Sequence, residues 1–360
     1  MFRTTTHYKY WIFDDEDELY RRRQEANHRF IRDNITLINV KPDEVPKHFL
    51  TMAEEVALVN YYLSLLRDFC RRFNPPIPKY VTSTSIQYFK RFYLNNSVME
   101  HHPKHLIVTC VYLAAKIEEF NVTMDQFVKN VKGDREKAAE IVLNNELLLL
   151  HKINYQLIIW HPYRSIEGFL IDIKTRCKSS SSNQDPERYR QHIDTFIDQC
   201  FLTDAFFLLC PNQLALLAII YAADKFGESM DEYLQILFGD NSSNEIAFLH
   251  KWMIKTNDLI RKIEQPAKNY VKQIDSKLEY IQNKLMSLKR TGSSSKRPID
   301  SDEEEIDDDN DQIQDDDDDD VVMENDTTTI PYERYSSHYR SAQDRNEQNI
   351  LERSNNKRNK

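Results

Sequence analysis

Glycine is scarce in this chain, and that scarcity limits what the chain can fold into. Only 5 of its 360 residues are glycine, whereas about 7% is usual. Enzymes that hold phosphates use glycine-rich turns, and Gly133, Gly168, Gly227, Gly239 and Gly292 cannot be assembled into such a motif. With 19 tyrosines and 18 phenylalanines beside so few turn residues, the chain is predicted to be an all-α protein.

Apolar residues recur at helical spacing through the first half of the chain. Prolines and polar clusters separate the segments, which predict five helices at about 52–73, 79–95, 103–117, 123–130 and 135–153. The third segment, which starts at Pro103, is apolar on nearly every side. A helix of that kind is surrounded by other helices. The sequence therefore predicts a five-helix group with the third helix at its centre.

The second half of the chain repeats this arrangement. Pro211–Ala223 parallels Pro103–Ala115 at an offset of 108 residues, and Met230–Leu234 parallels Met124–Val128 at an offset of 106. A central helix that starts with proline and is followed by a short helix, twice, predicts two copies of one helical domain.

The chain ends in a segment of different composition. Residues 300–327 contain 17 acidic residues and no basic ones, so the net charge of −10 comes from the tail and the rest is near neutral. Such a segment cannot bury enough apolar surface to fold. The predicted boundaries are an N-terminal helix and linker at 1–50, domains at 51–160 and 161–266, a C-terminal helix at 267–290 and a disordered acidic tail at 291–360.

Compartment and membrane signals favour a soluble intracellular protein. Five cysteines, including Cys177, form no C-x-x-C pair, which is typical of reduced thiols. The first ten residues have no apolar core. The longest apolar stretch, Leu214–Ala223, is shorter than the roughly 20 residues that span a bilayer.

Motifs for catalysis, metal binding or nucleic-acid binding are absent or weak. His101, His102 and His105 have no evident cysteine or carboxylate partner, so we expect solvated residues at a helix start and no metal or other cofactor. The run Arg21–Arg23 is predicted to be a solvated helix face, with a nucleic-acid contact as the alternative.

Lys116 is a charged residue at the end of an apolar helix, where its charge needs a partner or solvent. It directly follows the apolar stretch Val108–Ala115, and an unpaired buried ammonium is costly. Glu146, on the fifth predicted helix, is a candidate partner. An internal salt bridge, a lysine that reaches solvent, and a charge at an interface all remain open.

Three stretches carry a family resemblance. They are Leu113–Glu119, which reads Leu-Ala-Ala-Lys-Ile-Glu-Glu, and the longer runs Tyr88–Glu100 and Pro162–Arg176. With Glu119–Val122 they resemble the cyclins, and among them the cyclin H group, over about residues 8–290. The resemblance implies two tandem five-helix cyclin boxes with flanking N- and C-terminal helices.

The resemblance also implies a function and a surface. The first box of a cyclin docks a cyclin-dependent kinase and pushes the kinase αC helix inward, which aligns the kinase's own Lys–Glu pair. The positions that match the cyclin contacts are Lys116 and Glu146, with Ile117, Glu119, Phe120, Leu150, Tyr155 and Leu157 beside them. The chain itself is then expected to catalyse nothing.

The implied partners follow from the cyclin H group. They are the catalytic subunit of the CDK-activating kinase, a RING-finger assembly factor and the TFIIH core, and the implied substrates are CDK activation loops and the RNA polymerase II C-terminal repeats. A nuclear location is expected, with Lys289-Arg290 and Lys296-Arg297 as a weak import signal. No direct nucleic-acid or membrane binding is expected.

Alternative functions remain open. A cyclin of the C type is the nearest. A TFIIB-like nucleic-acid-binding protein is less favoured, because residues 161–290 are not strongly basic and no zinc ribbon precedes them. A purely structural helical scaffold is the third alternative.

Overall fold

The computed structural model is helical and describes residues 2–38, 44–176, 185–239, 242–263, 266–293 and 322–323. The elements before the first repeat are η1 (Phe2–Thr4), α1 (Thr6–Trp11), α2 (Glu16–Ile38) and α3 (Val45–His48). The first repeat comprises α4 (Met52–Arg72), α5 (Lys79–Asn95), α6 (Pro103–Ile117), α7 (Met124–Val128) and α8 (Arg135–Lys152). The second repeat comprises α9 (Tyr163–Arg176), η3 (Pro186–Tyr189), α10 (Arg190–Phe201), α11 (Ala205–Leu208), α12 (Pro211–Lys225), α13 (Asp231–Phe238) and α14 (Ser242–Arg261), and α15 (Lys268–Ser293) follows it. A two-residue parallel pair joins β1 (Lys132–Gly133) to β2 (Val322–Met323).

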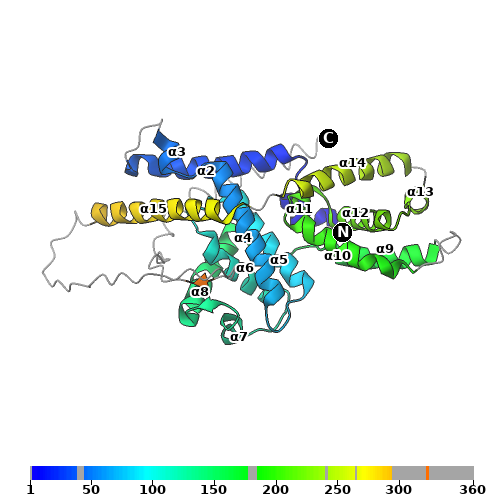
Figure 1. Cartoon of the computed structure of the whole chain (residues 1–360), viewed down its shortest axis with the longest axis horizontal. Coiled ribbons are helices and arrows are strands. Elements are labelled where there is room, and N and C mark those ends of the chain that lie inside the picture. The colour runs from blue at the N-terminus through cyan, green and yellow to red at the C-terminus, as the bar shows by residue number, and fades with distance from the viewer. Residues whose placement is uncertain are drawn as a thin grey trace. The chain divides into compact units, whose positions relative to one another are not determined.

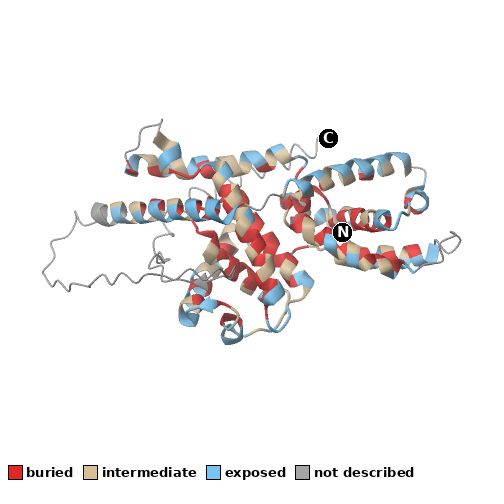
Figure 2. Ribbon diagram, viewed as in Figure 1, coloured by how far each residue is buried: buried red, intermediate tan, exposed pale blue. Residues whose placement is uncertain are grey.

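The first repeat is built around α6, as the sequence predicts. Pro103 occupies the first helical position, and the His102 side chain accepts a hydrogen bond from the Lys104 N–H. Proline fits there because its missing N–H would have no partner inside the helix. Buried residues run along most of α5 and α6 (Figure 2). The all-α class and the predicted helix bounds are confirmed here to within about two residues.

The second repeat has the same organisation around α12. Pro211 starts this helix, whose residues Leu214–Ile219 are all buried. Helices α9, α10 and α14 all contact α12 (Figure 1). Two similar groups of helices are therefore present, each with a proline-started helix at its centre.

Two long helices outside the repeats cover the first group. The Asp15 carboxylate accepts a hydrogen bond from the Glu18 N–H, which caps α2. Helix α15 packs on both α2 and α4 (Figure 1), and its buried apolar residues recur at helical spacing. These apolar residues are Val271, Ile274, Leu278, Ile281 and Leu285.

Helix α1 is an element that the sequence analysis missed. It is capped by the Thr5 hydroxyl, which accepts from the Tyr8 N–H. His7 and Trp11 of this helix are buried. Trp11 and the nearby Phe13 both pack against Phe207, which lies in the second repeat.

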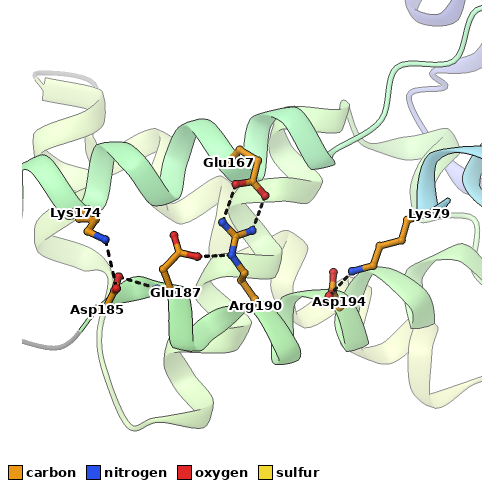
Figure 3. Close-up of polar contacts among 7 residues, drawn as sticks. All are labelled: Lys79, Glu167, Lys174, Asp185, Glu187, Arg190 and Asp194. Atoms are coloured by element: carbon orange, nitrogen blue, oxygen red, sulfur yellow. Dashed lines mark hydrogen bonds and ion pairs between the residues drawn. The ribbon is translucent and has the colours of Figure 1, made fainter.

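The two repeats are joined by one largely buried ionic contact and by exposed ones. Asp204, at the start of α11, accepts two hydrogen bonds of 2.8 Å from Arg23 of α2 and lies 3.6 Å from the Lys90 ammonium of α5. Although burial disfavours its charge, these two cations hold the pKa of Asp204 well below its usual range. At the surface, Lys79 pairs with Asp194 at 2.5 Å (Figure 3), in a row that also contains Arg190 bound to Glu167 and Glu187.

Two predictions about charged residues are wrong. Arg23 pairs with Asp204, so Arg21–Arg23 is not simply a solvated face. His101 and His102 are buried rather than solvated, and His102 Nε2 lies 3.5 Å from the Asp275 carboxylate of α15. Burial lowers the pKa of His102 to about 3.

Several predicted features lie outside the described residues. They are Cys177, the second half of the import signal at Lys296-Arg297 and nearly all of the acidic tail. Within the described ranges, no helix is both long and apolar enough to cross a membrane.

Candidate functional site

The Lys116 ammonium forms an ion pair with Glu146. Its Nζ atom lies 2.5 Å from Glu146 Oε1 and 5.5 Å from the centre of the Tyr112 ring. The lysine side chain is 49% exposed and that of the glutamate 17%. Lys116 lies in the last turn of α6, where a cation interacts favourably with the helix dipole. An ion pair with a half-exposed lysine contributes at most about 1 kcal/mol to the free energy of unfolding, and its ammonium remains accessible to another molecule.

The end of α6 places the residues that follow Lys116. The Phe120 N–H donates to the Ala115 carbonyl at 2.9 Å, and the Glu119 N–H to the Lys116 carbonyl at 3.4 Å. Glu119 has φ +56°, so the helix closes with a left-handed residue, as in a Schellman motif. This cap turns Phe120 back onto the core and leaves Ile117 and Glu119 exposed.

Helix α8 presents an exposed apolar stripe around Glu146. Leu143 and Leu147 are 59% and 43% exposed, and Leu150 is partly buried. Residues at these spacings share one helix face. Leu143 and Leu147 were not among the predicted site residues.

The segment after α8 adds further exposed apolar residues. The Tyr155 N–H donates to the Leu150 carbonyl at 2.9 Å, which closes α8. Tyr155 and Ile158 are 58% and 66% exposed, whereas Leu157 is partly buried against the core. Ile158 was also missing from the predicted set.

A partly buried polar network holds the end of α6. Glu118 accepts a hydrogen bond from the Thr84 hydroxyl at 2.6 Å and lies 3.4 Å from His161 Nε2. Burial alone would raise the pKa of Glu118, but the hydrogen bonds from His161 and Thr84 lower it. His161 Nδ1 also lies 2.8 Å from the Ser83 hydroxyl. The end of α6 is therefore tied to α5 and to the joint between the repeats.

All eight predicted residues lie on three connected segments. Lys116, Ile117, Glu119 and Phe120 lie at the end of α6, Glu146 and Leu150 on α8, and Tyr155 and Leu157 directly after it. The Lys116–Glu146 pair and the Tyr155–Leu150 hydrogen bond connect them. The result is an exposed apolar surface around an ion pair, which is typical of a protein-binding site.

The described residues offer little for covalent or metal chemistry. Burial raises the pKa of Cys70 to about 12, and the pKa of Cys110 is raised too, so both thiols stay protonated. No group of three His, Cys, Asp or Glu side chains in the described ranges is placed to hold a metal ion.

Comparisons with known proteins agree with this architecture. Family models of the cyclin N-terminal domain and the cyclin C-terminal domain match residues 54–158 and 161–289. Cyclin-H of Xenopus laevis is 39% identical over 300 residues, which cover 81% of this chain and 90% of the relative. Among solved structures, a chain of the yeast TFIIK complex (Kin28/Ccl1/Tfb3) aligns with a TM-score of 0.58 and 26% identity over 72% of this chain and 99% of that one. A chain of the Chaetomium thermophilum CAK complex aligns with a TM-score of 0.64 and 22% identity over 84% and 98%, which shows the shared fold.

Proposed function

The chain belongs to the cyclin family, and from that premise we propose that it is the H-type regulatory subunit of a CDK-activating kinase. The similarity to Cyclin-H of Xenopus laevis spans both cyclin boxes. The structural neighbours come from the TFIIK and CAK complexes. These two observations favour the H type over the C type.

The observation that carries a kinase-binding function is the surface around Lys116 and Glu146. Five large apolar side chains, which a protein normally buries, are exposed on α6, on α8 and after α8. They are Ile117, Leu143, Leu147, Tyr155 and Ile158. We propose that the kinase αC helix packs on them and that Lys116 and Glu146 bond to its backbone or side chains. Holding αC inward completes the kinase's own Lys–Glu pair, which its catalysis requires.

The wider assembly belongs to the same proposal. The chain supplies no catalytic group, and the kinase subunit performs the transfer of phosphate to CDK activation loops and to the RNA polymerase II C-terminal repeats. A RING-finger assembly factor and the TFIIH core complete the complex, which acts in the nucleus. No direct contact of this chain with nucleic acid is expected.

The test is to co-purify the tagged full-length chain and identify the bound kinase by mass spectrometry. We expect the CDK-activating kinase catalytic subunit, no ATP turnover by the kinase-free chain, and an increase in kinase rate when the two are mixed. Recovery of a different kinase would favour the C type, and recovery of nucleic acid without a kinase would favour a TFIIB-like role. ATP turnover by the chain alone would overturn the proposal that it is not an enzyme.

A further inference from the structure

The segment that connects the two cyclin boxes, residues 154–161 (hereafter the interbox linker), has two different sides. Tyr155 and Ile158 are exposed on the side assigned above to the kinase. Asn154 and Tyr155 both have φ +54°, a left-handed conformation that asparagine tolerates but that is costly for tyrosine. A segment in this conformation has to be held in place by its neighbours.

Helix α5 holds the backbone of the interbox linker from the inside. Arg91 Nη1 donates to the Gln156 carbonyl at 2.9 Å. The Tyr88 hydroxyl donates to the next carbonyl, that of Leu157, at 2.7 Å. Arg91 and Tyr88 are both fully buried. Two consecutive carbonyls of the linker are thus bonded by fully buried side chains of one helix.

Helix α1 holds the same segment from the other direction. Trp11 Nε1 donates to the Gln156 side-chain carbonyl at 2.5 Å. The backbone N–H of Trp160 donates to His7 Nδ1 at 3.0 Å, and the Trp160 ring packs edge-on against Phe2. The N-terminal residues therefore clamp both ends of the stretch that carries Ile158.

Arg91 is costly to maintain at this position. Within the described residues its Nε and Nη2 atoms have no hydrogen-bond partner, and no carboxylate pairs with it. Its guanidinium lies 4.6 Å from the centre of the Trp11 ring. Burial lowers the pKa of Arg91 to about 9, which leaves it charged at neutral pH. Even a buried ion pair can often be replaced by apolar side chains of similar size without loss of stability, so fold stability alone does not explain this buried charge, which has no carboxylate partner among the described residues.

We propose that Arg91 and helix α1 are positioning elements that fix the interbox linker, so that Tyr155 and Ile158 present their side chains to the kinase. The inference rests on the proposed kinase-binding function and adds Ile158 as a contact residue. Arg91 itself does not touch the kinase and acts through the backbone of Gln156.

A double-mutant cycle tests this coupling, because residues that act through one another are non-additive. The affinity of the full-length chain for the purified kinase subunit is measured for Arg91→Met, for the double variant Tyr155→Ala/Ile158→Ala, and for their combination. We expect the double variant to weaken binding at least tenfold and Arg91→Met to weaken it at least fivefold. In the Tyr155→Ala/Ile158→Ala background, Arg91→Met should change affinity by less than twofold.

Matched controls separate positioning from folding. Arg91→Met should melt within a few degrees of the unchanged chain, while amide hydrogen exchange in residues 155–160 rises at least fivefold and that in α6 does not. Arg23→Met, which removes a partly buried guanidinium, should lower the melting temperature and affect binding equally in both backgrounds. Trp11→Phe removes the donor to Gln156 and keeps the ring over Arg91, so it repeats the test if Arg91→Met fails to fold.

The outcomes distinguish the two proposals. Normal affinity of Tyr155→Ala/Ile158→Ala would refute the proposed kinase surface. Two results would refute only the positioning role, provided that Tyr155→Ala/Ile158→Ala does weaken binding. Either Arg91→Met lowers affinity equally in the unchanged chain and in the double variant, or Arg91→Met does not lower affinity at all.

Discussion

The central helices of the two cyclin boxes, α6 and α12, are alike until their last turns. Both contain 15 residues, start with proline and reach an Ala-Ala pair near the end. The next residue is Lys116 in α6 and Asp224 in α12. Three residues later, the backbone after each helix enters the left-handed region, at Glu119 with φ +56° and at Gly227 with φ +70°.

This difference separates what builds the box from what gives it a function. The shared proline and alanines set the start of the helix and its close packing, and they are present twice. The proposed site depends on the residues that differ. The second box uses glycine at the left-handed position, where it costs least, whereas the first box places a glutamate there beside its ion pair.

The largest expected effect comes from removing the ion pair of the first box. Lys116→Ala should lower activation of the bound kinase at least tenfold, since truncating one member of an interfacial ion pair costs on the order of 2–5 kcal/mol. The melting temperature of the free chain should change little, because Lys116 is half exposed. Kinase rate and thermal unfolding are measured on the same preparations.

Asp224→Ala is the matched control in the second box, since Asp224 is exposed and follows the equivalent Ala-Ala pair. It should leave both quantities unchanged. If Lys116→Ala melts several degrees lower yet activates normally when folded, the Lys116–Glu146 pair is purely structural.

The next comparison is between the two kinds of ionic contact that join the boxes. Asp204→Ala should destabilise the chain by about 3 kcal/mol, because it leaves Arg23 and Lys90 without their counter-ion in a mostly buried site. Asp194→Ala removes the partner of Lys79 (Figure 3), whose side chain is 63% exposed. It should cost less than about 0.5 kcal/mol. Denaturant unfolding measures the free energy of unfolding of both variants. If the two substitutions lowered it equally, the lower exposure of the Asp204 contact would not affect stability.

How much of this could be predicted from the sequence depends on how far apart the interacting residues are. The bounds of α6 follow from local signals, namely Pro103 and the apolar spacing up to Ile117. The Arg23–Asp204 and His102–Asp275 pairs join distant segments, and each residue taken alone reads as a polar surface residue. Helix α1 has only six residues, and its order depends on tertiary burial of His7 and Trp11.

The site was predicted through family resemblance, and its omissions have a physical cause. In the run Leu147–Leu150 every residue is leucine, so spacing cannot show which side faces solvent. The structure buries Leu149 completely and leaves Leu147 exposed. Ile158 lies outside any helix, where no periodicity applies.

A pH-dependent difference between the boxes is expected at the turns that precede α6 and α12. Ser97 donates its hydroxyl hydrogen to buried Glu55. In the turn before α12, Thr203, whose hydroxyl likewise accepts from the N–H two residues on, donates instead to the Cys200 carbonyl. Burial raises the pKa of Glu55 to about 7, against the opposing hydrogen bonds from Ser97 and Asn27. The folded state then binds this proton more tightly than the unfolded state, so Glu55 contributes stability below about pH 4.5 that is lost as the pH rises toward 7.

Glu55→Gln removes this titration and keeps an acceptor for Ser97. Relative to the unchanged chain, its free energy of unfolding should increase by on the order of 1–3 kcal/mol between pH 4.5 and 7.5. Unfolding curves across that range provide the measurement. A constant difference between the two proteins would show that Glu55 titrates normally.

The smallest effect concerns the two helix caps. Glu119→Gly should stabilise the free chain by about 1 kcal/mol, because glycine adopts positive φ without steric cost. Gly227→Ala should destabilise it by a similar amount, since its φ is positive although no atom lies within 4 Å of the added Cβ. In thermal unfolding, we expect Glu119→Gly to raise the melting temperature and Gly227→Ala to lower it. If both substitutions shifted it in the same direction, the left-handed conformation would not determine their effect on stability.

The largely buried contact at Asp204 also sets an order of events during synthesis. Arg23 and Asp204 lie 181 residues apart, and ribosomes add about 5–20 residues per second. The N-terminal helix and the whole first box therefore leave the ribosome several seconds before the carboxylate that neutralises Arg23 and Lys90. Until then Arg23 of α2 lacks its carboxylate partner, and Phe207, against which Trp11 packs, has not been made. The proposed kinase surface is therefore expected to take its final form only when the second box arrives, although none of its eight predicted residues belongs to that box.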